Sequence, residues 1–365
     1  MKNRLLRFVA LLFVLPFAST AFGADIGALI KQLGSANENE RESAIAEIRK
    51  LGLTADVALR KAENTEKMEQ QQWVLVRRLI GENLIAKGAL PALDLKTFAP
   101  FGEDKAKDIK GNPDLLLDKD KKIIVLNGEF VLEQGPLEYL VVSKGPDAKL
   151  HESILAVLPI PRDICYALLA CNYTYAGELG EDGKVNLPKD AGVMISVEFE
   201  WEIPHAKMGL PEDPEKKVPA VVGEKKTIRL PMEYFAFNSQ TERTMKRAPF
   251  AFTGSRFEKD PNTGKMYFMA DIEKSVVACR LDPYAILNTP LDTRGVDPQH
   301  AAGYGINRHV TPPRQTKCRV IFEPWSGGEL TKEDLTDTGE KVGAGEPPAG
   351  HPDAKPGSAP PPKEK

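Results

Sequence analysis

The chain has 365 residues, of which 42% are hydrophobic and 28% are charged, with 49 lysines and arginines against 52 aspartates and glutamates. This length is enough for two or more domain cores, because a domain usually takes about 100–200 residues. The formal net charge of −3 comes from mixed signs along the whole chain. The composition therefore excludes the basic footprint that binding to nucleic acid or to anionic lipid requires.

The first 23 residues have the pattern of a secretory signal peptide. Three basic residues precede an apolar run from Phe8 to Ala18, and small residues follow up to Gly23. A membrane-spanning helix needs about 20 apolar residues, so this run predicts a cleaved leader and no membrane anchor. We therefore expect an exported protein, either periplasmic or extracellular.

The segment after this leader predicts helices. Apolar residues recur at helical spacing from Ile26 to Leu33 and again from Ala44 to Leu51, which is the pattern of amphipathic helices. Ser35 and Glu38 match a capping box ahead of the second helix, and Gly52 is placed to cap its C-terminus. The spacing therefore predicts two helices with defined ends.

Two more helices are expected, one over 54–62 and a longer one around 73–84. Together, residues 24–85 resemble about one and a half hairpins of HEAT-like repeats. Such repeats bury their apolar faces against neighbours, and about three are usually needed for a stable stack. We therefore expect the segment 25–85 to dock on the rest of the chain or on a protein or peptide partner. A helical cap with no binding role is the alternative.

Residues 86–112 mix proline, glycine and charges, which predicts a linker. Strand patterns dominate from 113 to 326. The run VMISVEFEWEI at 193–203 alternates apolar and polar residues as a half-buried strand does, and residues 260–264 supply turn residues for a hairpin. Pro161 is placed at the first position of a helix.

A further short helix is expected over 282–287, before the last strand pattern at 317–325. Beyond Trp325 the apolar periodicity stops, and residues 327–365 are rich in proline and glycine. Such a segment cannot bury enough apolar surface to order itself, so it predicts a disordered tail. The overall prediction is an α+β protein with a small all-α HEAT-like unit, a mixed β-rich domain and a disordered tail.

Three short motifs lie in the strand-rich part: GPLEYL at 135–140, HES at 151–153 and FTGSRF at 252–257. In this combination they resemble the YdjY-like domain family, a group of exported bacterial proteins, over about 113–325. The resemblance implies no assigned activity. It also carries a link to ferredoxin-like proteins, but iron–sulfur ligation needs closely grouped thiolates, and the four cysteines of this chain lack that spacing.

The four cysteines leave two redox states open. Cys165 and Cys171 are six residues apart on an expected helix, so they point in different directions and should not pair. Cys279 and Cys318 lie in two apolar strand patterns, so a disulfide between them is one alternative. Because free cysteine packs as a small hydrophobe, four separate buried thiols are favoured.

The motif His151-Glu152-Ser153 raises the question of catalysis. If it lies in a strand over 150–158, side chains alternate faces, so His151 and Ser153 share a face about 6.5–7 Å apart. Hydrogen-bond activation of a nucleophile needs about 2.6–3.2 Å. The three residues are therefore not a triad by themselves. The third member would have to come from elsewhere, with Asp271 and Glu138 as the two candidates.

Three interpretations of this motif follow. In the structural interpretation, Ser153 and His151 form hydrogen bonds with backbone groups, and Glu152 is solvated or pairs with an arginine such as Arg256. In the binding one, these four residues line a polar groove for a small ligand or a peptide. In the catalytic one, Ser153 and His151 serve a hydrolase. The histidine and cysteine spacing predicts no metal site, and we expect no cofactor. A non-catalytic binding or scaffold module is the leading prediction.

Overall fold

The structure is a computed structural model, and it describes residues 25–93 except 66, 111–177, 192–201, 226–238, 243–291 and 303–327 except 309, together with positions 179, 185, 187, 330, 331, 340 and 341. The signal peptide expected at 1–23 lies outside these residues. Within the described ranges, no helix combines the length and the hydropathy needed to cross a bilayer.

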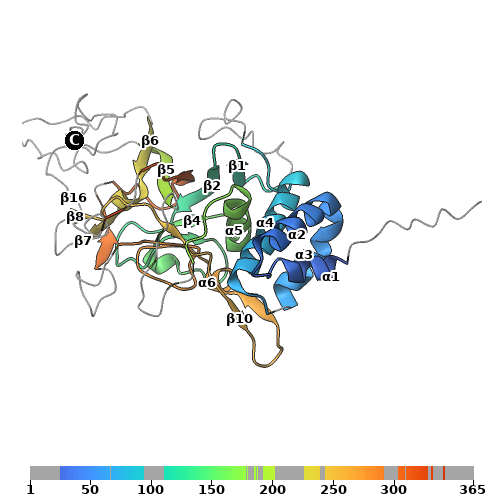
Figure 1. Ribbon diagram of the computed structural model, residues 1–365. Helices are drawn as coiled ribbons and strands as arrows, with labels where there is room; N and C mark the ends of the chain where they lie inside the picture. Colours follow the sequence, from blue (N-terminus) through green and yellow to red (C-terminus); the bar gives the residue numbers. More distant parts are fainter. Residues whose placement is uncertain are drawn as a thin grey trace, which may run out of the picture.

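The N-terminal part is a helical unit that lies beside the sheet-containing part (Figure 1). Its helices are α1 (Ile26–Gln32), α2 (Glu38–Leu51), α3 (Asp56–Thr65) and α4 (Gln70–Ala86), with the 3₁₀ turn η1 (Gly52–Ala55) between α2 and α3. Their apolar faces meet in a core that includes Leu33, Ile48 and Val76. The helices expected over 54–62 and 73–84 are confirmed, with ends that differ by two or three residues.

The ends of α2 follow the local sequence, with one correction. Asn37 caps α2, because its side chain accepts a backbone N–H of the first turn at 3.0 Å. Ser35 lies further out and donates to the Glu40 carboxylate at 2.6 Å. The capping box expected between Ser35 and Glu38 is therefore wrong, since asparagine caps as well as serine and stands next to the first turn. Gly52 ends the helix as expected, with φ of +52°.

The rest of the chain is built on a large mixed sheet. Its strands are β1 (Leu115–Asp118), β2 (Ile123–Phe130), β3 (Tyr139–Ser143), β4 (Ser153–Val157), β5 (Val193–Trp201), β6 (Lys226–Pro231), β9 (Ala251–Phe252), β12 (Ser275–Ala278), β13 (Leu287–Asn288) and β15 (Lys317–Pro324). Their order is β6-β5-β15-β2-β4-β3-β12-β13-β9, and β1 also pairs with β2. Pairs β3–β4 and β12–β13 are parallel and the others are antiparallel. A helical unit followed by a mixed sheet confirms the α+β class.

Strand β5 shows the period of two that its sequence predicts. Ile195, Val197 and Phe199 are buried, and the residues between them are partly exposed. On the buried face, Val197 stands opposite Val320 of β15 in an antiparallel register. The alternation therefore set both the type of element and the face that it buries.

Two smaller sheets complete the described fold. One is the hairpin of β10 (Phe257–Lys259) and β11 (Met266–Phe268), whose turn holds Asp260 Oδ1 against the backbone N–H of Asn262 at 2.7 Å. The other joins β14 (Tyr304–Ile306), β7 (Ala236–Asn238), β8 (Arg243–Thr244) and β16 (Glu340–Lys341). The hairpin is confirmed. Strand β16 falls in the segment that the sequence predicts to be disordered, most of which lies outside the described residues.

The helix expected over 282–287 is wrong. Asp282 turns the chain instead, because its Oδ1 accepts the backbone N–H of Tyr284 at 2.8 Å, and the segment then enters β13. An aspartate that bonds its own backbone two residues on favours a turn over a helix. The six-residue pattern at 282–287 was too short to distinguish a turn from a helix.

Helix α5 (Pro161–Ala170) joins the helical unit to the sheet. It starts with proline at its first turn, as expected, and lies between α4 and the sheet (Figure 1). Ile164 and Leu168 belong to the core of the sheet, whereas Tyr166 belongs to the core of the helical unit. The helical unit therefore docks on its own chain, through α4 and α5.

The contact between α4 and α5 depends on a glycine. A Cβ at Gly81 would lie 2.5 Å from the Tyr166 carbonyl oxygen, closer than such atoms come, and at a tight 3.1 Å from Ala170 Cβ. The first part of the expected linker, residues 86–93, also contacts the sheet, because the Leu93 N–H donates to the carbonyl of Leu117 in β1 at 2.6 Å. These contacts hold the two parts together along one seam.

Candidate functional site

The HES motif does not lie wholly in a strand. His151 and Glu152 belong to the 3₁₀ turn η3 (Leu150–Glu152), and Ser153 is the first residue of β4, so the strand expected over 150–158 is wrong at its start. The His151 side chain is 80% exposed, with Nε2 at 3.8 Å from Glu152 Oε2. Ser153 is buried, and its hydroxyl donates to the Lys149 carbonyl at 2.6 Å. The imidazole therefore faces solvent while the hydroxyl is occupied inside.

Asp271 is engaged elsewhere. It lies in α6 (Met269–Glu273), where Oδ1 accepts the backbone N–H of Arg162 at 3.0 Å and Oδ2 accepts its Nε at 2.9 Å. This carboxylate therefore caps the start of α5 and pairs with a guanidinium. It is not the partner of the Ser153 hydroxyl, whose hydrogen bond goes to a carbonyl.

Arg256 does not pair with Glu152, so the arginine that the structural interpretation offered as an example of a partner is wrong, whereas the Ser153 hydroxyl does bond a backbone group, as that interpretation expected. The Nη2 of Arg256 lies 2.6 Å from Glu258 Oε1 and donates to the Tyr284 hydroxyl at 2.9 Å. His151, Ser153, Asp271 and Arg256 thus have separate partners. The structure does not bring them together as one site.

Two motifs of the family resemblance meet in a buried polar network. Tyr139 of GPLEYL is 2% exposed; its hydroxyl donates to Asp282 Oδ2 at 2.7 Å and accepts from Lys149 Nζ at 2.9 Å. The backbone carbonyl of Lys149 accepts the hydroxyl of Ser153. Burial raises the pKa of Tyr139 well above its ordinary value, so the phenol stays neutral. These motif residues hold the β3–β4 region together and leave no free nucleophile.

A second polar cluster lies buried in the seam. Glu63 of α3 is 1% exposed; its Oε2 accepts the Tyr166 hydroxyl at 2.5 Å, and its Oε1 lies 3.3 Å from Arg77 Nε. Arg162 approaches the same carboxylate at 3.8 Å. Such a cluster stabilises only as a whole, because each charge would be costly to bury alone.

Aromatic rings cover the Arg77 guanidinium. Its Cζ lies 4.4 Å from the ring centroid of Phe257 and 4.8 Å from that of Phe268, both in the β10–β11 hairpin. Trp73 of α4 stacks on Phe257 with centroids 4.4 Å apart. The seam thus combines a buried ion pair with cation–π contacts. This ion pair was not predicted from the sequence. A usable signal was Glu63, because it stands four residues after Leu59, about one helical turn, and so lies on the same buried face of α3.

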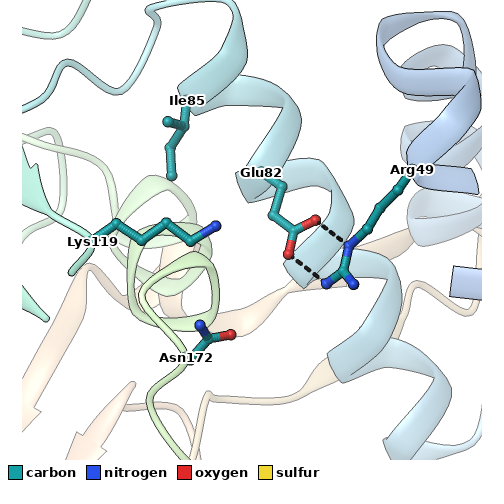
Figure 2. Close-up of a pocket in the computed structure, with 5 residues that line it drawn as sticks. All are labelled: Arg49, Glu82, Ile85, Lys119 and Asn172. Atoms are coloured by element: carbon teal, nitrogen blue, oxygen red, sulfur yellow. Dashed lines mark hydrogen bonds and ion pairs between the residues drawn. The ribbon is translucent and has the colours of Figure 1, made fainter. Parts of the chain in front are cut away.

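A pocket opens at another part of the seam. It has a volume of about 410 Å³ and is lined by Arg49 of α2, Glu82 and Ile85 of α4, Lys119 in the turn between β1 and β2, and Asn172 after α5 (Figure 2). Both parts of the chain therefore contribute to its walls. Its volume falls in the range of about 300–1,000 Å³ that small-ligand sites occupy.

One wall of the pocket is a paired guanidinium. Arg49 donates from Nε to Glu82 Oε2 at 2.9 Å and from Nη2 to Oε1 at 2.8 Å, which Figure 2 shows as two dashed lines. This fork raises the pKa of Arg49. The two bonds orient the side chains toward each other and form a polar wall, in which the Arg49 side chain is 49% exposed and that of Glu82 is 17% exposed.

The opposite wall is held by backbone contacts. Asn172 has φ of +57°, a conformation that asparagine tolerates well, and its carbonyl accepts Lys122 Nζ at 3.2 Å. The side chains of Lys119 and Asn172 extend toward the space beside Glu82 (Figure 2). Both residues are exposed, and among the described residues neither side chain has a hydrogen bond or an ion pair.

The cysteines are four buried free thiols, as the sequence favoured over a Cys279–Cys318 disulfide. Burial raises the pKa of Cys165 to about 11 and that of Cys279 to about 12, so neither is a ready nucleophile. In the part of the chain that the structure describes, no group of histidine, cysteine, aspartate and glutamate side chains could hold a metal ion.

Comparisons with known proteins give no further assignment, because no family model, no curated protein and no solved structure matches this chain.

Proposed function

We propose that the chain is an exported, non-catalytic binding module whose ligand site is the pocket lined by Arg49, Glu82, Ile85, Lys119 and Asn172. The observation that carries the proposal is that both parts of the chain build this pocket, and that the side chains of Lys119 and Asn172, which have no hydrogen bond or ion pair within the described ranges, extend into it. The signal-like sequence at 1–23 supports export. A protein partner of the helical unit would use faces other than the one that α5 covers.

A hydrolase that uses Ser153 and His151 is the other function considered, and the geometry gives it little support. Ser153 is buried and donates its hydroxyl to a carbonyl, whereas His151 is solvated. A serine-reactive fluorophosphonate probe separates the two functions. We expect no labelling of the wild type; labelling that disappears in Ser153→Ala would overturn the binding proposal.

Ligand binding is tested with a library of small anionic, cationic and neutral fragments, followed by saturation-transfer NMR. We expect some fragments to bind the wild type and to be lost in Ile85→Trp, because the larger side chain fills the pocket. The control is Ile272→Trp, since Ile272 is 49% exposed on α6 and is not part of the pocket. If no fragment binds, or if Ile85→Trp binds as the wild type does, the proposal is wrong.

A further inference from the structure

Exposed aliphatic side chains come together where the parallel strands β3 and β4 end. Three of them lie there: Leu158 at 45% exposed, Ile160 at 50% and Ile272 at 49%. Ser143, the last residue of β3, joins the two segments that carry them, because its N–H donates to the Lys274 carbonyl at 2.7 Å and its hydroxyl donates to the Pro159 carbonyl at 2.7 Å. The two segments therefore adjoin at the end of β3.

The segment 158–161 has a restricted backbone, because prolines alternate with its aliphatic residues. Its sequence is Leu-Pro-Ile-Pro, and a residue that precedes proline is biased to extended backbone. Ile160 has φ of −74° and ψ of 150°, which is such a conformation. A ligand therefore meets a preorganised surface, and its binding costs little conformational entropy.

The backbone of this segment has both bonded and unbonded groups. The Leu158 N–H donates to the Asn127 carbonyl at 2.9 Å, and the Pro159 carbonyl accepts the Ser143 hydroxyl. The Leu158 carbonyl and the Ile160 N–H have no partner among the described residues. These two groups flank Pro159 and point to the same side of an extended chain, so another extended chain can pair with both of them.

Charges of both signs surround the segment, and the closest ones pair with each other. Arg162 Nε donates to Asp271 Oδ2 at 2.9 Å, and Lys144 Nζ donates to Glu129 Oε1 at 2.7 Å. Asp163 is half-buried, with the charges of Asp271 and Arg162 acting on its carboxyl group. Because neither sign dominates, the surface favours an uncharged partner.

The size of the surface favours a short peptide over a second copy of the chain. Three half-exposed aliphatic side chains supply roughly 250 Å², whereas a stable protein interface takes about 800 Å² from each partner. A few residues of an extended peptide are enough to cover such an area.

We propose that the backbone of residues 158–160 pairs with an extended, uncharged aliphatic segment of a partner protein, whose side chains pack on Leu158, Ile160 and Ile272. In this mode of recognition, main-chain hydrogen bonds give affinity and side-chain contacts give specificity. None of these residues lines the pocket described above. The inference therefore goes beyond the proposed function and does not depend on it.

The probe is the peptide N-acetyl-Thr-Val-Ile-Val-Thr-amide. Its control is N-acetyl-Thr-Gly-Gly-Gly-Thr-amide, which keeps the backbone and lacks the aliphatic side chains. A peptide-observed NMR titration with the full chain should give a dissociation constant on the order of 1 mM for the aliphatic peptide, as expected for so small a surface. The glycine peptide should bind about tenfold more weakly.

Two substitutions at position 160 separate the side chain from the backbone. Ile160→Ala should weaken the aliphatic peptide about fivefold, because apolar contact is lost. Ile160→Pro should bind about fivefold more weakly than Ile160→Ala, because it also removes the N–H, and proline fits the φ of −74°. Val57→Ala, at an α3 residue that is 78% exposed, should bind like the wild type.

Far-UV circular dichroism checks that each variant folds. If Ile160→Pro does not fold, the aliphatic peptide methylated on every backbone nitrogen replaces it, since that peptide cannot donate to the Leu158 carbonyl. The proposal is overturned if the wild type does not bind, if the two peptides bind equally, if Ile160→Ala binds like the wild type, or if loss of the N–H changes nothing further. A dimer in sedimentation velocity that Ile160→Ala dissociates would assign the surface to a second copy and would also overturn it.

Discussion

The buried pair of Glu63 and Arg77 allows a quantitative prediction. Glu63→Gln removes one charge at nearly constant volume, and the glutamine can still accept the Tyr166 hydroxyl. Both side chains of the ion pair are under 10% exposed, at 1% and 7%, so the guanidinium left behind stays desolvated. Removing one partner of a buried ion pair costs about 3–5 kcal/mol.

The surroundings of Arg77 place the expected loss near the low end of that range. The rings of Phe257 and Phe268 lie within 5 Å of its guanidinium, and cation–π contacts of a desolvated arginine are worth about 2 kcal/mol. They persist after the substitution and partly compensate for the lost carboxylate. We therefore expect Glu63→Gln to lower the free energy of unfolding by about 3 kcal/mol.

Urea unfolding measures this change, with fluorescence and far-UV circular dichroism as two probes. Trp73 stacks on Phe257 in the seam, so fluorescence reports on this contact. The matched control is Glu47→Gln, whose ion pair with Lys50 joins side chains that are 44% and 71% exposed; it should change stability by less than about 1 kcal/mol. A Glu63→Gln variant within 1 kcal/mol of the wild type would refute the reasoning that the cluster stabilises the seam.

Two further predictions concern the same region. Gly81→Ala should lower the free energy of unfolding in urea by about 1–2 kcal/mol, because the overlap with the Tyr166 carbonyl costs more than the helix propensity that alanine adds. The control is Gly27→Ala, whose Cβ meets a flexible aspartate side chain at 3.2 Å and which should be neutral or slightly stabilising. Equal effects of the two substitutions would refute the close-packing argument. Burial first, and then the charge of Asp271, raise the pKa of Asp163. Asp163 therefore contributes most to stability when it is protonated, at a pH below its pKa in the unfolded chain, which is about 4. That contribution is lost as the pH rises through its pKa in the folded protein. Asp163→Asn should therefore raise the free energy of unfolding at pH 7 and flatten its fall above pH 4, and an unchanged pH profile would contradict the raised pKa.

Local sequence determined much of the fold. Alternation in 193–203 identified β5 and its buried face, Pro161 marked the start of α5, and the turn residues after Asp260 marked a hairpin. Each of these signals works within a few residues, through side-chain period, a fixed φ or a side chain that bonds nearby backbone. Where two such signals competed, as at Ser35 and Asn37 or over 282–287, the sequence alone did not separate them.

The site required the tertiary structure. The motif at 151–153 is adjacent in the sequence, yet the fold places His151 in solvent and Ser153 inside. The pocket instead gathers Arg49, Glu82 and Lys119, which have no motif in common and lie up to 70 positions apart. Their proximity depends on how α4 packs against α5 and on where the β1–β2 turn falls, and no local pattern encodes that packing.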